Sequence, residues 1–333
     1  MRVGVTGITG QFGKALARVL EAEPVVTEVV GVARRPFDPA SEGFRKLVYR
    51  QGDVRDPGLR EAFVGCDVVV HLAFIIGGRR EDQQQRREIN VDGSRNVFAS
   101  AVEAGVRKIV YASSIAAYGA YPDNPDLIDE QHPTRGMPGV SYSQEKAEVE
   151  AVLDLFEKEH PALTVTRMRV CAVVGPGFQD MLWEFLPDQL RRLPLFAPWF
   201  PRVFPNPIQG GKLLLQAVHE DDVAEAFRLA IVTDAPGAFN IAGEDVLGAR
   251  DVATIMRAAT LPMPLAGARQ LVDLAYRLRV SKVPGDWVDL MRYPILVDTH
   301  RARTLLGWQP RYTSETALRA TADALFSARG ASE

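Results

Sequence analysis

The sequence contains little cysteine. Only two of its 333 residues are cysteines, Cys66 and Cys171, and each lies in an apolar stretch. So few cysteines argue against a disulfide framework, and we expect both to be buried, reduced thiols. This pattern is typical of a cytoplasmic protein.

The sequence also has little net charge and no long apolar run. A net charge of −3 leaves no basic surface for nucleic acid or anionic lipid. No apolar run reaches the roughly 18 residues that a membrane-spanning helix needs. We therefore expect a chain that is neither exported nor membrane-spanning, and whose partner is a small molecule.

Metal-ligand spacing is absent as well. None of the five histidines is spaced from the cysteines or from the other histidines as metal ligands are. We expect each to be a structural or surface histidine. The acidic run at 219–222 is better explained by Asp221 or Asp222 as the N-cap of a helix than by a cation site. The sequence thus predicts no metal.

The first half of the chain alternates short β-branched runs with longer helical patterns, which is the rhythm of βαβ units in a parallel sheet. Strands are predicted at 3–6, 28–33, 46–49, 67–73, 108–113 and 163–170, and helices at 10–21, 83–104 and 141–160. Residues 186–209 differ, because they include six prolines and several aromatic residues. We expect that segment to be irregular rather than a regular sheet, and either to cover a substrate or only to pack.

Three glycines follow the first predicted strand. Gly7 permits a tight turn, Gly10 allows the backbone to approach a pyrophosphate, and Gly13 lets helix and strand pack closely. The N-terminus of the following helix offers unpaired N–H groups to the phosphates. The pattern predicts a dinucleotide-binding fold of the Rossmann type, with a doubly wound parallel sheet.

The end of the second predicted strand lacks the acid that binds the adenosine ribose of NAD. Arg34 and Arg35 occupy that place, and guanidinium groups suit the 2′-phosphate of NADP. Asp38 lies slightly late for the ribose role but keeps NAD open. The sequence therefore favours NADP over NAD.

Tyr142 and Lys146 are four residues apart in a predicted helix and so share one face. A tyrosine acts as an acid-base group only if its pKa is lowered, and a neighbouring ammonium and a positive nicotinamide ring favour the phenolate. Ser113 and Ser114 end the strand predicted at 108–113, at the sheet edge where ligands bind. There, a serine hydroxyl can orient a substrate oxygen.

Together these motifs resemble the extended short-chain dehydrogenase/reductase family, which includes the NAD-dependent epimerases and dehydratases. By this resemblance the catalytic residues are Ser114, Tyr142 and Lys146, with Lys146 binding the nicotinamide ribose and lowering the pKa of the tyrosine. The residues that the resemblance assigns to the cofactor are Gly7, Thr9, Gly10, Gln11, Phe12, Gly13, Asp53, Val54, Leu72, Ala73, Asn90, Ser113, Tyr142 and Lys146. Arg34 and Arg35 join them from the argument above.

The resemblance also implies a domain organisation. Residues 1–176 would form the dinucleotide-binding domain, with 216–242 returning to it. Residues 177–215 and 245–333 would form a smaller, mostly C-terminal α+β substrate-binding domain. A homodimer through 83–104 and 141–160 is usual in the family.

Some positions depart from the family pattern. Ala172 and Leu215 stand where nucleotide-sugar epimerases carry an asparagine and an arginine, and neither side chain binds a diphosphate. Ile115 and Ala116 replace the acid-base pair of sugar dehydratases. The leading hypothesis is an NAD(P)-dependent oxidoreductase acting on a secondary alcohol or carbonyl of a relatively apolar molecule. An epimerase that retains its cofactor is the alternative, and a non-catalytic dinucleotide sensor is the third.

Overall fold

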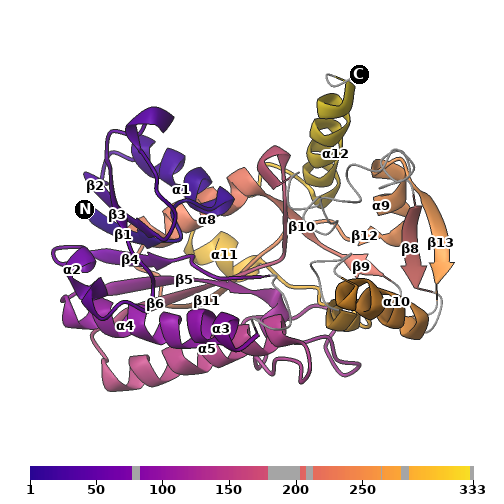
Figure 1. Ribbon diagram of the computed structural model, residues 1–333, viewed down its shortest axis with the longest axis horizontal. Coiled ribbons are helices and arrows are strands. Elements are labelled where there is room, and N and C mark those ends of the chain that lie inside the picture. Colours follow the sequence, from indigo (N-terminus) through magenta and orange to yellow (C-terminus); the bar gives the residue numbers. More distant parts are fainter. Residues whose placement is uncertain (77–82, 179–202, 208–212, 264, 279–284, 331–333) are drawn as a thin grey trace.

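The structure is a computed structural model that describes residues 1–76, 83–178, 203–207, 213–263, 265–278 and 285–330. A seven-stranded parallel sheet lies at its centre, flanked by helices on both faces (Figure 1). In spatial order its strands are β11 (Gly237–Ile241), β6 (Thr164–Val170), β5 (Lys108–Ser114), β4 (Val68–His71), β1 (Arg2–Thr6), β2 (Glu28–Ala33) and β3 (Leu47–Gln51). The predicted doubly wound α/β fold is confirmed.

The strand order reverses between β1 and β4. From β1 the chain passes to β2 and β3 on one side, and then returns to the other side of β1 as β4. In such sheets a crevice opens at the carboxyl ends of the strands beside this switch point, and ligands bind there. The residues that follow Thr6 and His71 therefore line the expected ligand site.

Each face of the sheet has its own apolar core. On one face α1 (Gln11–Ala22) packs against α8 (Glu220–Val232), and Leu16 of α1 and Phe227 of α8 are fully buried. On the other face α4 (Gly93–Glu103) packs against α5 (Ser141–Glu159), over Phe98 and Leu153. Burial on both sides explains why β1 and β4 are nearly continuous apolar runs.

The helix predicted at 83–104 is interrupted. The chain forms α3 (Gln83–Arg87), then a π-helical turn η4 (Glu88–Asp92), and only then α4. A π turn adds one residue to a helical turn and is frequent at functional sites. Here it contains Asn90.

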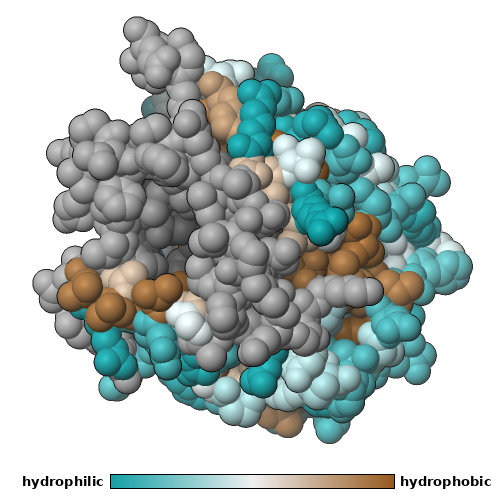
Figure 2. All heavy atoms as spheres, turned by 90° about the vertical axis from the view of Figure 1, so that its right-hand side faces the viewer, coloured by the Kyte–Doolittle hydropathy of each residue, from teal (hydrophilic) through white to brown (hydrophobic). Residues whose placement is uncertain are grey.

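Several short elements lie at the other end of the molecule, on the right of Figure 1. They pair as β7 (Ala172–Val174) with β10 (Ala217–His219), β9 (Leu214–Leu215) with β12 (Leu247–Gly248), and β8 (Val203–Pro207) with β13 (Ala259–Met263). The helices there are α9 (Ala249–Ile255), α10 (Leu265–Arg277) and α12 (Ser314–Gly330), and the 3-10 helix η7 (Gly285–Met291) follows α10. Figure 2 faces this end and shows hydrophobic patches between hydrophilic ones.

Several connecting segments contain short helices. One-turn helices η1 (Ala40–Glu42) and η2 (Pro57–Leu59) join the strands of the first half, and η2 leads into α2 (Arg60–Phe63). Later turns are η5 (Ile115–Ala117), η6 (Pro176–Phe178) and α11 (His300–Leu305). Both cysteines are free and buried, as the sequence predicts. Among the described residues no helix is long and apolar enough to cross a membrane.

Two local predictions were wrong. Residues 203–207, inside the segment expected to be irregular, form strand β8. Its prolines are tolerated because each strand of a two-stranded pair has a free edge. Apart from this strand, most of 186–209 lies outside the described residues. The N-cap of α8 is His219, which accepts a hydrogen bond from the Asp221 amide, while Asp222 accepts from the amides of Arg311 and Tyr312.

Candidate active site

The glycine loop is built as its spacing predicts. Gly7 has φ +76°, and a Cβ there would lie 2.8 Å from the amide nitrogen of Ala73. A Cβ at Gly13 would lie 2.5 Å from the Gly7 carbonyl oxygen and 2.6 Å from that of Ile8. The loop, the segment after β4 and α1 thus pack backbone against backbone. At Gly10 a Cβ would meet one atom within 4 Å, the Gly7 carbonyl oxygen at 3.3 Å, so this position is less crowded than Gly7 and Gly13.

The N-terminus of α1 suits an anion. Gly10 is its extended N-cap and makes no side-chain cap, and the first turn, which begins at Gln11, holds no acidic residue. Free N–H groups at a helix start attract phosphate. Phe12 faces the other way and packs edge-on against Phe227 of α8, with ring centres 4.7 Å apart. The Phe12 ring therefore anchors the helix on α8, and its predicted contact with the cofactor stays a prediction.

The two arginines after β2 are exposed at the same edge of the sheet. Arg35 donates to the Thr9 carbonyl oxygen at 3.2 Å, which brings its guanidinium to the glycine loop. Arg34 is near enough to Asp53 to contribute to the lowering of the pKa of that carboxyl. The largest cause of that lowering is Arg55, which pairs with Asp53 through two hydrogen bonds of 3.0 Å. The Asp53 carboxylate is thus already paired with the Arg55 guanidinium.

A buried polar chain runs beneath the switch point. The Thr6 hydroxyl lies 2.7 Å from Nδ1 of His71, and Nε2 of His71 lies 2.8 Å from the Ser94 hydroxyl. Burial lowers the pKa of His71 to about 3, so the ring is neutral. Thr6 also accepts from the amide of Ala73, and the amide of Leu72 donates to the carbonyl of Thr6. This series of hydrogen bonds fixes the segment after β4, and His71 has the structural role expected of it.

Asn90 holds the same segment from the π turn. Its amide group accepts from the Ile75 amide at 2.8 Å and donates to the Ile75 carbonyl at 2.9 Å. It also donates to buried Glu145 of α5 at 2.7 Å. Nearby, a Cβ at Gly93 would meet Val54 at 2.6 Å, so the Val54 loop packs directly on α4. Asn90 and Val54 therefore shape the site through packing and backbone contacts.

Ser114, Tyr142 and Lys146 lie together. Ser114 is the last residue of β5, and its hydroxyl accepts from the Ala116 amide at 3.2 Å. A hydrogen bond between the side chains of Tyr142 and Ser114 lowers the pKa of the tyrosine. Lys146, one turn further along α5, is buried. The predicted trio thus converges at the carboxyl edge of the sheet.

Burial governs the protonation of Tyr142 and Lys146. Burial raises the pKa of Tyr142, and the hydrogen bond with Ser114 offsets this only in part. The ammonium of Lys146 donates to the Ala112 carbonyl at 2.6 Å and lies 5.9 Å from the centre of the Tyr142 ring. Burial lowers the pKa of Lys146 itself to about 7, although Glu150 and Glu145 oppose this. Burial therefore outweighs any lowering of the Tyr142 pKa by Lys146, and the lowering expected from Lys146 together with a positive nicotinamide ring stays a prediction.

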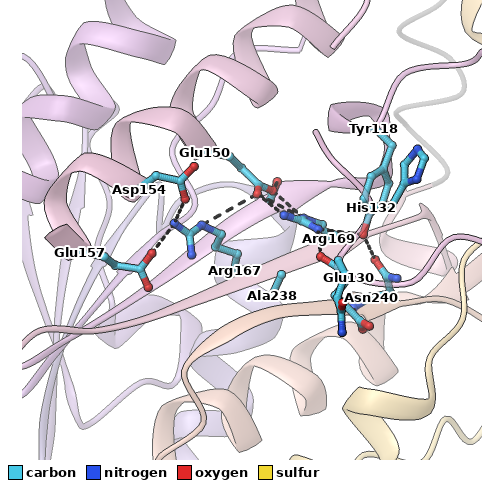
Figure 3. A network of polar contacts seen from close by, with 12 residues as sticks. Tyr118, Glu130, His132, Glu150, Asp154, Glu157, Arg167, Arg169, Ala238 and Asn240 are labelled. Carbon is cyan, nitrogen blue, oxygen red and sulfur yellow. Dashed lines mark hydrogen bonds and ion pairs between the residues drawn. The ribbon is translucent and has the colours of Figure 1, made fainter. Parts of the chain in front are cut away.

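Ser113 points into a second polar network, shown in Figure 3 around Glu150 and Arg169. Its hydroxyl donates to Glu150 at 2.6 Å, so this side chain already has an acceptor within the protein. Arg169 of β6 donates to the same carboxylate at 2.5 Å and to the Tyr118 hydroxyl at 2.9 Å. Both charged groups are buried. This pair joins α5 to the sheet directly behind Lys146.

Sequence reasoning missed Glu150, Phe74 and Trp287. Glu150 lies four residues after Lys146, so the spacing that found the lysine also indicates it. Phe74 follows the Leu72-Ala73 pair, and the Lys146 ammonium lies 3.6 Å from its ring centre. Trp287 stacks on Tyr142 from the C-terminal part of the chain, and no sequence signal links the two.

The sequence model of the "NAD dependent epimerase/dehydratase family" matches residues 3–242, about 72% of the chain. The chain belongs to this family. It is therefore an enzyme of the extended short-chain dehydrogenase/reductase type that uses a nicotinamide dinucleotide. Within the described part of the chain, no cluster of His, Cys, Asp and Glu side chains is arranged to hold a metal ion.

Several curated proteins are similar to this chain. An uncharacterized protein of Mycobacterium tuberculosis is 26% identical over 333 residues, covering 98% of this chain and 83% of its own length. Sterol demethylase protein B of Methylococcus capsulatus is 33% identical over 191 residues, covering 56% of this chain and 54% of its own. A 4-hydroxy-2-methyl-3-oxo-4-farnesyl-3,4-dihydroquinoline-1-oxide ketoreductase of Stigmatella aurantiaca is 25% identical, covering 99% and 98%.

Solved structures share the fold. UDP-glucuronic acid 4-epimerase from Bacillus cereus, in complex with NAD, has a TM-score of 0.73 and 18% identity, covering 98% of this chain and 99% of its own. The dTDP-glucose 4,6-dehydratase DesIV from Streptomyces venezuelae, with NAD and TYD bound, has a TM-score of 0.73 and 22% identity, covering 99% and 98%. At these identities the likeness shows the fold alone.

Proposed function

We propose that the protein is an NAD(P)-dependent oxidoreductase that interconverts a secondary alcohol and a carbonyl on a relatively apolar small molecule. The observation that carries this is the convergence of Ser114, Tyr142 and Lys146 at the carboxyl edge of the sheet, beside the loop of Gly7. An acid-base group, an orienting hydroxyl and a cation are the groups that such a reaction needs.

In this proposal the Tyr142 hydroxyl exchanges a proton with the substrate oxygen, and Ser114 hydrogen-bonds the same oxygen. The raised pKa keeps the proton on Tyr142 at neutral pH, which suits donation to a carbonyl. An ammonium has three donors, and among the described residues Lys146 gives one to the Ala112 carbonyl. Its other donors suit the hydroxyls of a nicotinamide ribose.

The chain's residues fit a dinucleotide. The missing side chain at Gly10 and the uncapped start of α1 suit a pyrophosphate, and Arg34 and Arg35 suit a 2′-phosphate, so we propose NADP over NAD. When bound, the dinucleotide supplies or accepts the hydride. The remaining assigned residues, Thr9, Gln11, Gly13, Asp53, Val54, Leu72, Ala73 and Asn90, would shape this site by the contacts described above.

Two positions favour an apolar substrate over a nucleotide sugar. Ala172 in β7 and Leu215 in β9 offer no donor or charge to a diphosphate. The printed names of two relatives, a sterol demethylase protein and a farnesyl dihydroquinoline ketoreductase, concern molecules with large apolar parts. Both lines support a substrate that is less polar than a sugar diphosphate.

An epimerase is the second candidate, because several solved structures of the same fold are sugar-nucleotide epimerases with NAD. It would use the same three residues but keep its dinucleotide and return the hydride to the other face. Tight co-purification of a dinucleotide and turnover of a UDP-sugar would favour it. A dinucleotide sensor without catalysis is the third, and would bind NAD(P) but transfer no hydride to any substrate.

The deciding experiment follows the oxidation of NADPH and NADH by absorbance with a panel of ketones and aldehydes, beside an epimerisation assay on UDP-sugars. Tyr142→Phe is expected to lower turnover by about 100-fold or more while dinucleotide binding persists. Tyr312→Phe is the matched control, since that ring stacks on His219, away from the trio. Unchanged turnover in Tyr142→Phe would refute the proton-transfer role.

We further propose the two-domain division at 1–176 with 216–242 and at 177–215 with 245–333. Strand β11 supports it, because it pairs with β6 in the main sheet. A homodimer in the cytoplasm, formed through α4 and α5, is also proposed. These helices pack on one face of the sheet, and light scattering of the purified protein would measure its mass.

A further inference from the structure

The ring of Tyr142 lies between two other aromatic rings. Trp287 stacks on it with ring centres 5.1 Å apart and planes 28° apart. Phe74 meets it edge-on, at 5.8 Å and 88°. Trp287 belongs to η7 and lies outside residues 3–242, which match the family, whereas Phe74 lies after β4. Two distant parts of the chain thus enclose the proposed acid-base group.

The position of Trp287 is fixed from the side of α10. The amide of Gly285 donates to Asp273 at 3.0 Å, and Arg269 donates to Asp289 at 2.6 Å. A Cβ at Gly285 would lie 2.5 Å from the Asp273 carboxylate, so η7 packs closely on the helix. The indole is therefore presented by a braced segment.

The same segment also touches the start of α5. Asp286 accepts from the Ser141 amide at 3.4 Å, one residue before Tyr142. The contact is long, but it places η7 at the helix end that carries the tyrosine. Trp287 and Asp286 together therefore set the surroundings of Tyr142.

These rings limit what can bind beside Tyr142. A substrate oxygen must come within hydrogen-bond distance of the Tyr142 hydroxyl to exchange a proton. The carbon skeleton attached to it then lies within a few ångströms of the tyrosine ring and of its neighbours. Trp287 is half-buried, so part of its indole is open to contact. Flat aromatic surfaces favour flat, apolar partners.

The charges nearby point the same way. The charged side chain next to Trp287 in η7 is Asp286, and a carboxyl group does not attract a diphosphate. The ammonium of Lys146 is already held against the face of Phe74 and the carbonyl of Ala112. The wall beside Tyr142 is therefore aromatic rather than cationic.

We propose that Trp287, together with Phe74, is a specificity-determining wall that takes a flat, apolar ring system of the substrate next to the reacting oxygen. This rests on the proposed oxidoreductase function and names its substrate class: a polycyclic or aromatic ketone or alcohol.

The test compares Trp287→Ala, Trp287→Phe and the wild type on two kinds of ketone, with NADPH present. Progesterone and tetralone are the flat probes, and butanone is the compact one. In Trp287→Ala, kcat/KM for the flat ketones should fall by roughly tenfold more than for butanone, mainly through KM. Trp287→Phe should keep most of the preference. Met291→Ala, at an exposed position of η7, is the matched control, and thermal melting checks folding.

Equal losses for flat and compact ketones would mean that Trp287 only supports Tyr142, and would overturn the proposal. Retained preference in Trp287→Ala would overturn it too. If the wild type oxidises neither NADPH nor NADH with any ketone, the oxidoreductase proposal fails, and calorimetric binding of progesterone and tetralone then tests the wall separately. Binding that weakens in Trp287→Ala supports the wall, and no binding to the wild type overturns it.

Discussion

The ammonium of Lys146 lies 3.6 Å from the centre of the Phe74 ring, and it donates a hydrogen bond to the Ala112 carbonyl. A buried cation held by a π face and one carbonyl loses most of its hydration, which disfavours the charged form. This is the physical reason why the pKa of Lys146 falls to about 7.

The lowered pKa makes stability depend on pH. Between about pH 7 and the usual lysine value of 10.5, the unfolded chain binds the Lys146 proton more tightly than the folded chain does. The free energy of unfolding of the wild type should therefore rise with pH relative to Lys146→Met, and the difference should be constant below that range. Urea unfolding at about pH 6 and about pH 9 measures this. Lys158→Met, at an exposed lysine of the same helix, controls for the loss of one charge. A difference that does not change with pH would contradict the shift.

A methyl group at the third glycine of the loop should separate α1 from the loop. In Gly13→Ala the new Cβ would meet the carbonyl oxygens of Gly7 and Ile8 at 2.5 and 2.6 Å. We expect a loss of dinucleotide affinity together with a destabilisation of about 1–3 kcal/mol, as overpacking usually costs. Gly58→Ala is the control, because a Cβ there meets nothing within 4 Å. Calorimetric titration and thermal melting give both quantities, and normal binding by Gly13→Ala would contradict the close packing.

Arg34 and Arg35, after β2, should contribute to the affinity for NADP and hardly at all to the affinity for NAD. Replacing both Arg34 and Arg35 with alanine is expected to raise the Kd for NADP by about 10- to 100-fold, because charged hydrogen bonds to phosphate are lost. The Kd for NAD should change only slightly. Fluorescence titration with both dinucleotides measures this, and Arg45→Ala controls for charge because that side chain is 91% exposed. An equal loss of affinity for NAD would rule out the binding of the 2′-phosphate by Arg34 and Arg35.

Removing one partner of the buried Arg169–Glu150 pair should destabilise the fold. Arg169→Met leaves the Glu150 carboxylate without its closest cation, and we expect a destabilisation of about 3–5 kcal/mol. The double variant with Glu150→Leu should recover part of it, since no charge then stays unpaired. Arg319→Ala breaks an exposed pair with Glu315 and should cost less than about 1 kcal/mol. Urea unfolding distinguishes these outcomes, and a small effect of Arg169→Met would contradict the burial of this pair.

Much of the fold and part of the site follow from local sequence patterns. The glycine spacing, the strand-end serine and the i, i+4 pair of Tyr142 and Lys146 each depend on one or two neighbouring elements, so the sequence carries them. The parallel sheet follows from the alternation of strands and helices.

Other features depend on contacts between distant segments. Trp287 reaches Tyr142 only because η7 packs on α10 and on the start of α5, and no periodicity in the sequence predicts that. The net rise in the pKa of Tyr142 that burial causes could not be predicted, because the degree of burial is set by the tertiary structure. The histidine cap of α8 was missed because aspartate is the commoner N-cap.

Strand β11 reaches the sheet from far along the chain and forms its outer edge beside β6. A shortened chain that stopped after residue 176 would keep the glycine loop, Ser114, Tyr142 and Lys146, but would leave the unpaired N–H and C=O groups of β6 exposed. Such an edge recruits other strands and promotes aggregation. The sheet of this protein therefore cannot be cut out as a contiguous segment that ends at residue 176; it needs β11, which is made only after residues 177–215.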